Sequence, residues 1–365
     1  MKIAERFLNF QKYAPIEPFE VLSEKLGLKR EDIVKLDANE NPYGPAPAVK
    51  QCLADLQNVN IYPDPENRAL RAMLSEFTGV AQKSIMVGAG ADELIDLLLR
   101  VMLEPGDIVI NCPPTFGMYS FDTRLNNGIM IEVNRNFDFS INIQNIREAV
   151  IENSAKILFL TSPNNPDGSV ISDEELRQIL KLPVLVVLDE AYIEFTADTV
   201  AEWRLNSRMD WVTAHENLVI LRTFSKWAGL AGLRVGYGAF PEWLMPTLWS
   251  AKQPYNLNVA GNQAAMASLL SLDYLSGNVR KIREDRRKLF GLLSTLPFLE
   301  PVPSEANFIL CRVKNFPASY LKNYLLEKGI MVRYYETPIL ENYIRISIGK
   351  PGDHLRLIQA MEQLI

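Results

Sequence analysis

Short apolar runs alternate with amphipathic stretches of helical period from residue 84 onward. Runs of this kind, of which 184–188 is the most continuous, are typical of strands buried on both faces. We therefore expect an α/β domain of three layers, in which helices cover both faces of a mainly parallel central sheet. The expected strands are 84–87, 108–111, 129–133, 156–161, 184–188, 218–221 and 235–239.

The pattern changes near residue 257, where a helix and then a long charged helix lead into a smaller α+β unit. Its expected strands are 307–313, 330–333 and 343–348. Two prolines interrupt the opening of the chain, which predicts an arm that packs with the small domain. The expected parts are an N-terminal arm at 1–35, a large domain at 36–257 and a small C-terminal domain at 258–365.

Composition narrows the classes of function. The 365 residues are 48% hydrophobic, which suffices for two domain cores. A net charge of -6 without long basic runs argues against binding to nucleic acid or anionic membranes. The chain lacks both an apolar stretch near the ~20 residues that span a bilayer and a signal-peptide core. With three isolated cysteines, these features favour a cytoplasmic protein.

Histidine is scarce, since the chain holds only His215 and His354. This excludes most histidine-rich zinc sites and disfavours a serine–histidine triad, so we expect no metal site. Acid–base chemistry must then depend on lysine, tyrosine or carboxylate side chains.

Lys226 follows the expected strand 218–221 and precedes small and apolar residues. A lysine that lacks water and lies near other cations has a lowered pKa, and its neutral amine can form a Schiff base. Arg222, Arg234 and Ser225 add cations and a hydroxyl that suit a phosphate. The combination indicates pyridoxal phosphate, and a loop with ordinary surface charges is the alternative interpretation.

Residues 88–93 join a strand to a helix through two glycines, and such a helix N-terminus suits an anion. Glu93 stands where a dinucleotide fingerprint needs its third glycine, which disfavours a nicotinamide dehydrogenase. A plain turn before the helix is the alternative.

Further candidates follow the next strands, at the edge of the sheet where ligands bind in α/β proteins. Phe116 can stack on an aromatic ring, Asn165 can donate to a phenolic oxygen, and Asp189 can pair with a protonated pyridine nitrogen. A core phenylalanine, a simple turn and a helix cap are the respective alternatives.

The motifs in this order resemble those of the fold-type I pyridoxal-phosphate-dependent aminotransferases. The segments that carry the resemblance are LDANENPYGP (36–45), YPDP (62–65), GADE (90–93), PPTFGMY (113–119), SPNNPDG (162–168), DEAYIEF (189–195) and RTFSKWAGLAGLR (222–234). The first two are similar to those of the branch that acts on histidinol phosphate. The resemblance implies a reversible transamination. In it, histidinol phosphate and 2-oxoglutarate give imidazole acetol phosphate and glutamate.

The resemblance also implies roles at the cofactor. Lys226 would bind its aldehyde and carry the substrate's α-proton, and Asp189 would pair with the ring nitrogen. Asn165 and Tyr192 would bond the ring oxygen, and Phe116 would stack on the ring, where the family often has tyrosine. The residues implied around the phosphate are Gly90, Ala91, Asp92, Ser225, Arg234 and, from the other subunit of a homodimer, Tyr62.

For the substrate, the resemblance implies that Arg345, aided by Arg333 and Tyr13, holds the anionic end. Asn39 lies in a polar loop that we expect to line the same pocket. Ile16 stands where the family often has glycine, a departure from the pattern of the arm.

Three other functions remain open on these residues. An aromatic amino acid aminotransferase and a decarboxylase of a phosphorylated amino acid share the same cofactor residues. A regulatory module that binds the cofactor without turnover would need a DNA-binding domain or partner surface, which the short arm and acidic charge disfavour.

Overall fold

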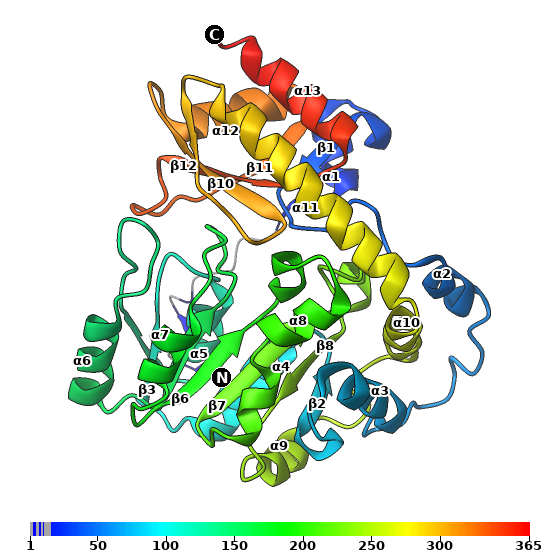
Figure 1. Ribbon diagram of the computed structural model, residues 1–365, viewed down its shortest axis with the longest axis vertical. Coiled ribbons are helices and arrows are strands. Elements are labelled where there is room, and N and C mark those ends of the chain that lie inside the picture. The colour runs from blue at the N-terminus through cyan, green and yellow to red at the C-terminus, as the bar shows by residue number, and fades with distance from the viewer. Residues whose placement is uncertain (1–2, 5–6, 9, 11–15) are drawn as a thin grey trace.

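The computed structural model describes residues 3–4, 7–8, 10 and 16–365 (Figure 1). A seven-stranded sheet forms its larger part, and every strand expected between residues 84 and 239 is confirmed. All neighbouring strands in it are parallel except at β8, which is antiparallel to both β2 and β7. In sheet order the strands are β2 (Ile85–Gly88), β8 (Gly236–Ala239), β7 (Leu218–Thr223), β6 (Leu185–Asp189), β5 (Ile157–Thr161), β3 (Ile108–Asn111) and β4 (Ile129–Glu132).

The large sheet is covered on both faces because alternate side chains of each strand enter different cores. On β5, Leu158 and Leu160 join one cluster, while Ile157 and Phe159 join the other. The first cluster includes side chains of α3 (Arg68–Thr78), α6 (Ile143–Asn153), α7 (Asp173–Ile179) and α8 (Val200–Asn206). The second includes those of α4 (Ala91–Met102), α5 (Met118–Leu125) and α9 (Met245–Ala251). The expected three-layer α/β architecture is confirmed.

A second sheet of five strands lies above the first in Figure 1. Its order is β1 (Val34–Leu36), β11 (Ile330–Tyr334), β12 (Tyr343–Ser347), β10 (Phe308–Val313) and β9 (Leu299–Pro301). β1 and β9 were not expected, because three residues are too few to show a period. β1 pairs in parallel with β11, so the chain before the large domain is part of this sheet.

The remaining helices surround the two sheets, and the long helix α11 runs beside both (Figure 1). They are α1 (Phe19–Leu26), α2 (Pro47–Ala54), α10 (Val259–Leu269), α11 (Leu272–Ser294), α12 (Ala318–Glu327) and α13 (Pro351–Glu362). Among the described residues, none of the helices combines the length and the apolar character needed to cross a membrane.

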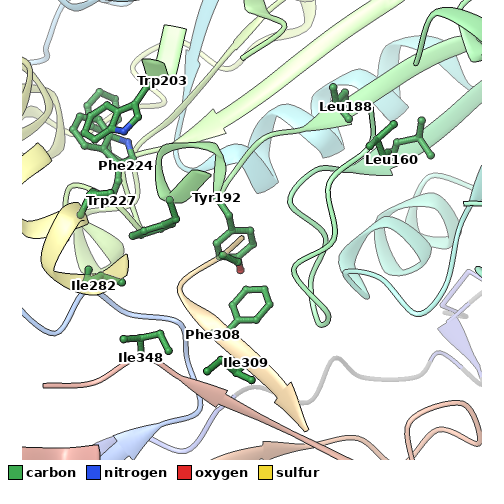
Figure 2. Packing of buried hydrophobic residues seen from close by; sticks show 14 of the residues in the cluster. Leu160, Leu188, Tyr192, Trp203, Phe224, Trp227, Ile282, Phe308, Ile309 and Ile348 are labelled. Atoms are coloured by element: carbon green, nitrogen blue, oxygen red, sulfur yellow. The ribbon is translucent and has the colours of Figure 1, made fainter. Parts of the chain in front are cut away.

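The two sheets share one hydrophobic cluster (Figure 2). Tyr192 follows β6 and packs edge-on against Phe308 of β10, with 5.1 Å between ring centroids. Trp227 packs against Trp203 and Phe224 in the same cluster. Large buried rings therefore pack against the segment that carries Lys226, so the backbone at this lysine is held rigidly.

Candidate active site

Two adjoining cavities lie at the carboxyl ends of the parallel strands. The inner cavity, of about 130 Å³, is lined by residues that follow β5, β6 and β7. The outer chamber, of about 690 Å³, extends from there between the two sheets. Four residues line both spaces: Phe116, Asn165, Tyr192 and Lys226. A ligand in the inner cavity would therefore be in direct reach of a second molecule in the chamber.

Lys226 lies in the wall of the inner cavity, partly buried, with Nζ 3.3 Å from the Ala38 carbonyl oxygen to which it donates. Within the described part of the chain, no ion pair includes this lysine. Burial, followed by the positive charge of Arg345, lowers the pKa of Lys226 to about 8. A neutral amine is therefore available near physiological pH.

Asp189 ends β6 in the same cavity and is 5% exposed. Burial raises the pKa of Asp189 to about 6, although Tyr119 Oη donates to Oδ2 at 2.7 Å and the Ala191 amide donates to Oδ1 at 2.9 Å. No cationic side chain among those described pairs with it. A buried carboxylate of this kind lacks a positive partner, which a protonated ring nitrogen would supply.

Tyr119 is a site residue that the sequence analysis quoted in a motif but gave no role. Its ring is fully buried in α5, a helix that was not expected, and its hydroxyl also bonds Thr161 Oγ1 at 2.8 Å. The available signal was its position three residues after Phe116, which places both rings near one strand end.

An anion site lies at the other end of the inner cavity, where α4 begins. Gly90 precedes the helix at φ +87°, and a Cβ there would lie 2.7 Å from Arg234 Nη2. A Cβ on Gly236 would lie 2.3 Å from the Ala91 amide nitrogen, so β8 also needs glycine to approach the turn. Arg234 donates to Asp92 Oδ2 at 2.7 Å across the mouth. The first amides of α4 and the guanidinium thus face one space.

Ser225 lines the same space, but Arg222 does not. Arg222 is 1% exposed and donates to Glu194 Oε1 at 2.6 Å. Because side chains alternate along a strand, Thr223 faces the cavity while Arg222 points to the opposite face of β7. The expectation that Arg222 joins a phosphate site is wrong.

These features fit pyridoxal phosphate as a cofactor. The amine of Lys226 has a lowered pKa, the Asp189 carboxylate lacks a cation, and the start of α4 forms an anion site. They match the aldehyde, the ring nitrogen and the phosphate of that molecule, respectively. Phe116 lies in the wall of the same cavity, edge-on to Tyr119 with 5.6 Å between ring centroids.

Two arginines of the second sheet line the outer chamber. Arg333 and Arg345 are cross-strand neighbours in register on β11 and β12. Arg345 donates to Asn165 Oδ1 and to the Asp37 carbonyl oxygen, both at 2.6 Å, while its Nε is buried and makes no hydrogen bond to any residue that the structure describes. Like charges directly opposite each other are unfavourable, so this pair is suited to an anion between or beside them.

Asn39 also lines the chamber, but its side chain is committed to other residues. Its Nδ2 donates to Tyr192 Oη at 3.1 Å, and its Oδ1 accepts from Ser347 Oγ at 2.8 Å. Asn39 therefore links β12 to the tyrosine that faces the inner cavity.

The remaining expected residues lie elsewhere. Tyr62 is 77% exposed, stacks on Tyr255 with 4.5 Å between ring centroids, and lines neither cavity of its own chain. Tyr13 lies outside the described residues.

Comparisons with known proteins point to one family. Residues 31–361 match the model of the family described as Aminotransferase class I and II. The chloroplastic histidinol-phosphate aminotransferase of Nicotiana tabacum is 53% identical over 361 residues, which are 99% of this chain and 86% of that protein. That of Roseiflexus castenholzii is 44% identical over 362 residues, or 97% of this chain and 95% of the other.

Among solved structures, the histidinol-phosphate aminotransferase of Sinorhizobium meliloti in complex with pyridoxal-5'-phosphate superposes with a TM-score of 0.87. The match is 27% identical and covers 100% of this chain and 99% of that one.

Proposed function

Because this chain belongs to the class I and II aminotransferase family, we propose that it exchanges an amino group between histidinol phosphate and 2-oxoglutarate. The products are imidazole acetol phosphate and glutamate, and the reaction is a step of histidine biosynthesis. Pyridoxal phosphate is the cofactor. The relatives that support this assignment are named for the same reaction and match nearly the whole chain.

The main support for the proposal is that two groups in one small cavity have pKa values shifted in opposite directions. The amine of Lys226 has its pKa lowered to about 8, and the carboxyl group of Asp189 has its pKa raised to about 6. Such a pair of groups in one cavity is typical of functional sites. Each would be satisfied by a different part of the same cofactor.

The chemistry that bound pyridoxal phosphate supplies is an aldehyde carbon for the amino group and a ring that withdraws electrons. Lys226 would hold the aldehyde, and Asp189 would keep a proton on the ring nitrogen. Asn165 and Tyr192 would bond the ring oxygen, and Phe116 would cover one face of the ring. The phosphate would be held by Gly90, Ala91, Asp92, Ser225 and Arg234.

Lys226 also provides the proton transfer. A group whose pKa lies near 8 is present in both protonation states close to neutral pH, so Nζ would take the proton from the substrate α-carbon and, once protonated, pass it on instead of returning it to that carbon. Among the described residues, its amine has one hydrogen bond, the 3.3 Å contact with the Ala38 carbonyl oxygen, so little holds it against turning toward either space.

Arg345 and Arg333 would hold the anionic end of each substrate. A planar guanidinium binds phosphate and carboxylate with similar geometry, so the same pair can serve histidinol phosphate and glutamate in turn. Tyr13 of the arm and Asn39 complete this proposed substrate site. Residues 36–257 would thus supply the cofactor pocket, and residues 258–365 the substrate cations.

The exposure of Tyr62 supports a homodimer in our proposal. Its side chain is 77% exposed and lines neither cavity of its own chain, which suits a contact with the cofactor phosphate of a second subunit. Mixing of subunits that carry either Y62F or K226A would test this arrangement through partial recovery of activity.

Spectral titration of the purified protein tests the proposal. We expect a yellow absorption band that changes when histidinol phosphate is added and is restored by 2-oxoglutarate. Turnover of phenylalanine without turnover of histidinol phosphate would assign the protein to the aromatic aminotransferases, and release of carbon dioxide to the decarboxylases. A protein that takes up no pyridoxal phosphate would refute both cofactor and reaction.

A further inference from the structure

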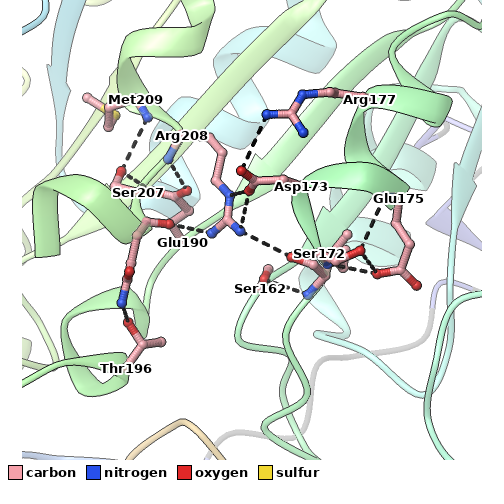
Figure 3. Close-up of polar contacts among 12 residues, drawn as sticks. Ser162, Ser172, Asp173, Glu175, Arg177, Glu190, Thr196, Ser207, Arg208 and Met209 are labelled. Carbon is pink, nitrogen blue, oxygen red and sulfur yellow. Dashed lines mark hydrogen bonds and ion pairs between the residues drawn. The ribbon is translucent and has the colours of Figure 1, made fainter. Parts of the chain in front are cut away.

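A ring of contacts connects the end of β6, which carries Asp189, with the loop that carries Asn165. Figure 3 shows its part between Glu190 and Ser162. Glu190 directly follows Asp189 and is 0% exposed. Its Oε2 accepts from Ser207 Oγ, and its Oε1 accepts from the Arg208 amide at 2.8 Å. The carboxylate therefore holds the segment that follows α8 against the end of β6.

Arg208 extends the ring from that segment to the next loop. Its Nη2 donates to Asp173 Oδ1 at 2.9 Å and to the Ile171 carbonyl oxygen at 3.3 Å. Its Nη1 donates to the Asn206 carbonyl oxygen, so the guanidinium is fixed from both sides. The side chain is only 11% exposed, in contrast to a typical surface arginine.

The ring closes at Ser162. The Ile171 amide donates to Ser162 Oγ at 3.0 Å, and the Ser162 amide donates to the Asp189 carbonyl oxygen at 2.9 Å. Asn165 lies in the loop between Ser162 and Ile171, so both ends of that loop are held by this ring.

The ion pair with Asp173 is not needed to start α7. Ser172 and Glu175 already form a complete capping box at that end, and Asp173 itself favours the helix N-terminus through its charge. The guanidinium therefore has a role other than helix capping. Its bond to the Ile171 carbonyl oxygen indicates that this role is to fix the loop that carries Asn165.

We propose that Glu190 and Arg208 are positioning residues that act through Asp189 and Asn165 on the cofactor pocket, by fixing the end of β6 and the loop that carry these two residues. Neither side chain lines the inner cavity or the outer chamber. The inference rests on the proposed cofactor role of the inner cavity. Supporting contacts of this kind keep the residues that touch a ligand within about 0.5 Å of the positions that binding requires.

The test compares R208A and E190Q with R177A, each in the full chain. Arg177 is the matched control, because it also contacts Asp173, at 3.5 Å, but has no bond to the 162–171 loop or to Glu190. We expect R208A and E190Q to raise the Kd for pyridoxal phosphate by about 10-fold. R177A should remain within about 2-fold of the wild type.

Amide hydrogen exchange on the cofactor-free proteins gives a readout independent of activity. Residues 162–171 should exchange faster in R208A and E190Q than in R177A, while α4 remains unchanged. R208K should recover part of the cofactor affinity, because a lysine ammonium can still donate a hydrogen bond to the Ile171 carbonyl oxygen. Equal Kd values and equal exchange in R208A and R177A would overturn the inference.

Failure of the proposed function has a different signature. If the wild type bound no pyridoxal phosphate, the cofactor assignment would fail, while the exchange rates of residues 162–171 would still report whether Arg208 and Glu190 fix the loop. If those rates were raised in all three variants alike, the effect would be general loosening of α7 and the inference would be wrong.

Discussion

Arg222 and Lys226 are two cations four residues apart, and they differ in the groups with which they pair. Arg222 is 1% exposed and paired with the equally buried Glu194 at 2.6 Å. Phe77 and Tyr237 cover its guanidinium at 5.3 and 5.6 Å. Lys226 has a carbonyl oxygen as partner and, among residues 3–4, 7–8, 10 and 16–365, no carboxylate in an ion pair with it. The same short motif thus holds a structural cation and a reactive one.

The difference shows that burial alone does not make a cation reactive. Burial acts to lower the pKa of Arg222, but Tyr237 and Glu194 more than offset it, and the guanidinium stays charged. Burial also raises the pKa of Glu194 to about 7, which Arg222 only partly opposes. At Lys226 burial and Arg345 act in the same direction, so the amine loses its proton more easily.

The largest effect should follow K226A. Removing the amine abolishes cofactor attachment and proton transfer, so we expect transamination to fall by at least about 10³-fold. The yellow band should shift to that of unattached cofactor. The cofactor-free protein should be no less stable than the wild type, because no carboxylate loses a partner.

K226R is the matched control, since it keeps a cation but cannot present a neutral amine near neutral pH. It should be as inactive as K226A. Near-normal turnover by K226R would break the comparison, because charge rather than a free amine would then be the property that matters.

Arg222 should show the reverse pattern, with stability as the main effect. R222M leaves Glu194 buried without a partner, and we expect a loss of about 3 to 5 kcal/mol in the free energy of unfolding measured in urea. The double variant R222M/E194L removes both charges and should recover most of that loss. If R222M cost less than about 1 kcal/mol, Arg222 would not be the structural cation that this comparison makes it.

The contrast between these residues also marks what the sequence could predict. Strands such as β6 were predictable because their buried faces give continuous apolar runs, and site residues at their ends followed from the general position of ligands in α/β sheets. The face to which Arg222 points depends on strand register, which a basic, hydroxyl-rich motif does not reveal.

Other parts of the site depend on contacts between distant segments. The bond between Asn39 and Ser347 joins residues 308 positions apart, and nothing local to Asn39 announces it. Tyr119 lies in α5, whose eight residues mix aromatic, polar and β-branched types without a clear helical period. Its bond to Asp189 across 70 positions could not be read from either motif alone.

D189N should have an intermediate effect, on the cofactor rather than on the fold. The amide can still accept from Tyr119 but carries no negative charge, so we expect the Kd for pyridoxal phosphate to rise by about 10²-fold in an equilibrium titration. D210N, at an exposed aspartate, is the control and should bind normally. Tight binding by D189N would mean that the carboxylate needs no cation.

The smallest effect concerns the pH dependence of stability in the cofactor-free protein. Lys226 has a pKa of about 8 in the folded chain and about 10.4 in an unfolded one. Below pH 8 both states hold the proton, so the folded state bears the full cost of the buried charge. Between pH 8 and 10.4 the unfolded state holds more protons, and stability rises with pH.

K226M lacks this titration, so it should be more stable than the wild type at pH 7. The difference should shrink by about 1 to 2 kcal/mol as the pH rises to 10.4, a value reduced for the partial exposure of the amine. Urea unfolding at a series of pH values measures it. Above about pH 8, R222M/E194L should differ from the wild type by a nearly constant amount, because Arg222 stays charged and Glu194, with its pKa of about 7, is already ionised. A difference between K226M and the wild type that did not change with pH would mean that the buried amine carries no penalty, and the distinction between the two cations would be lost.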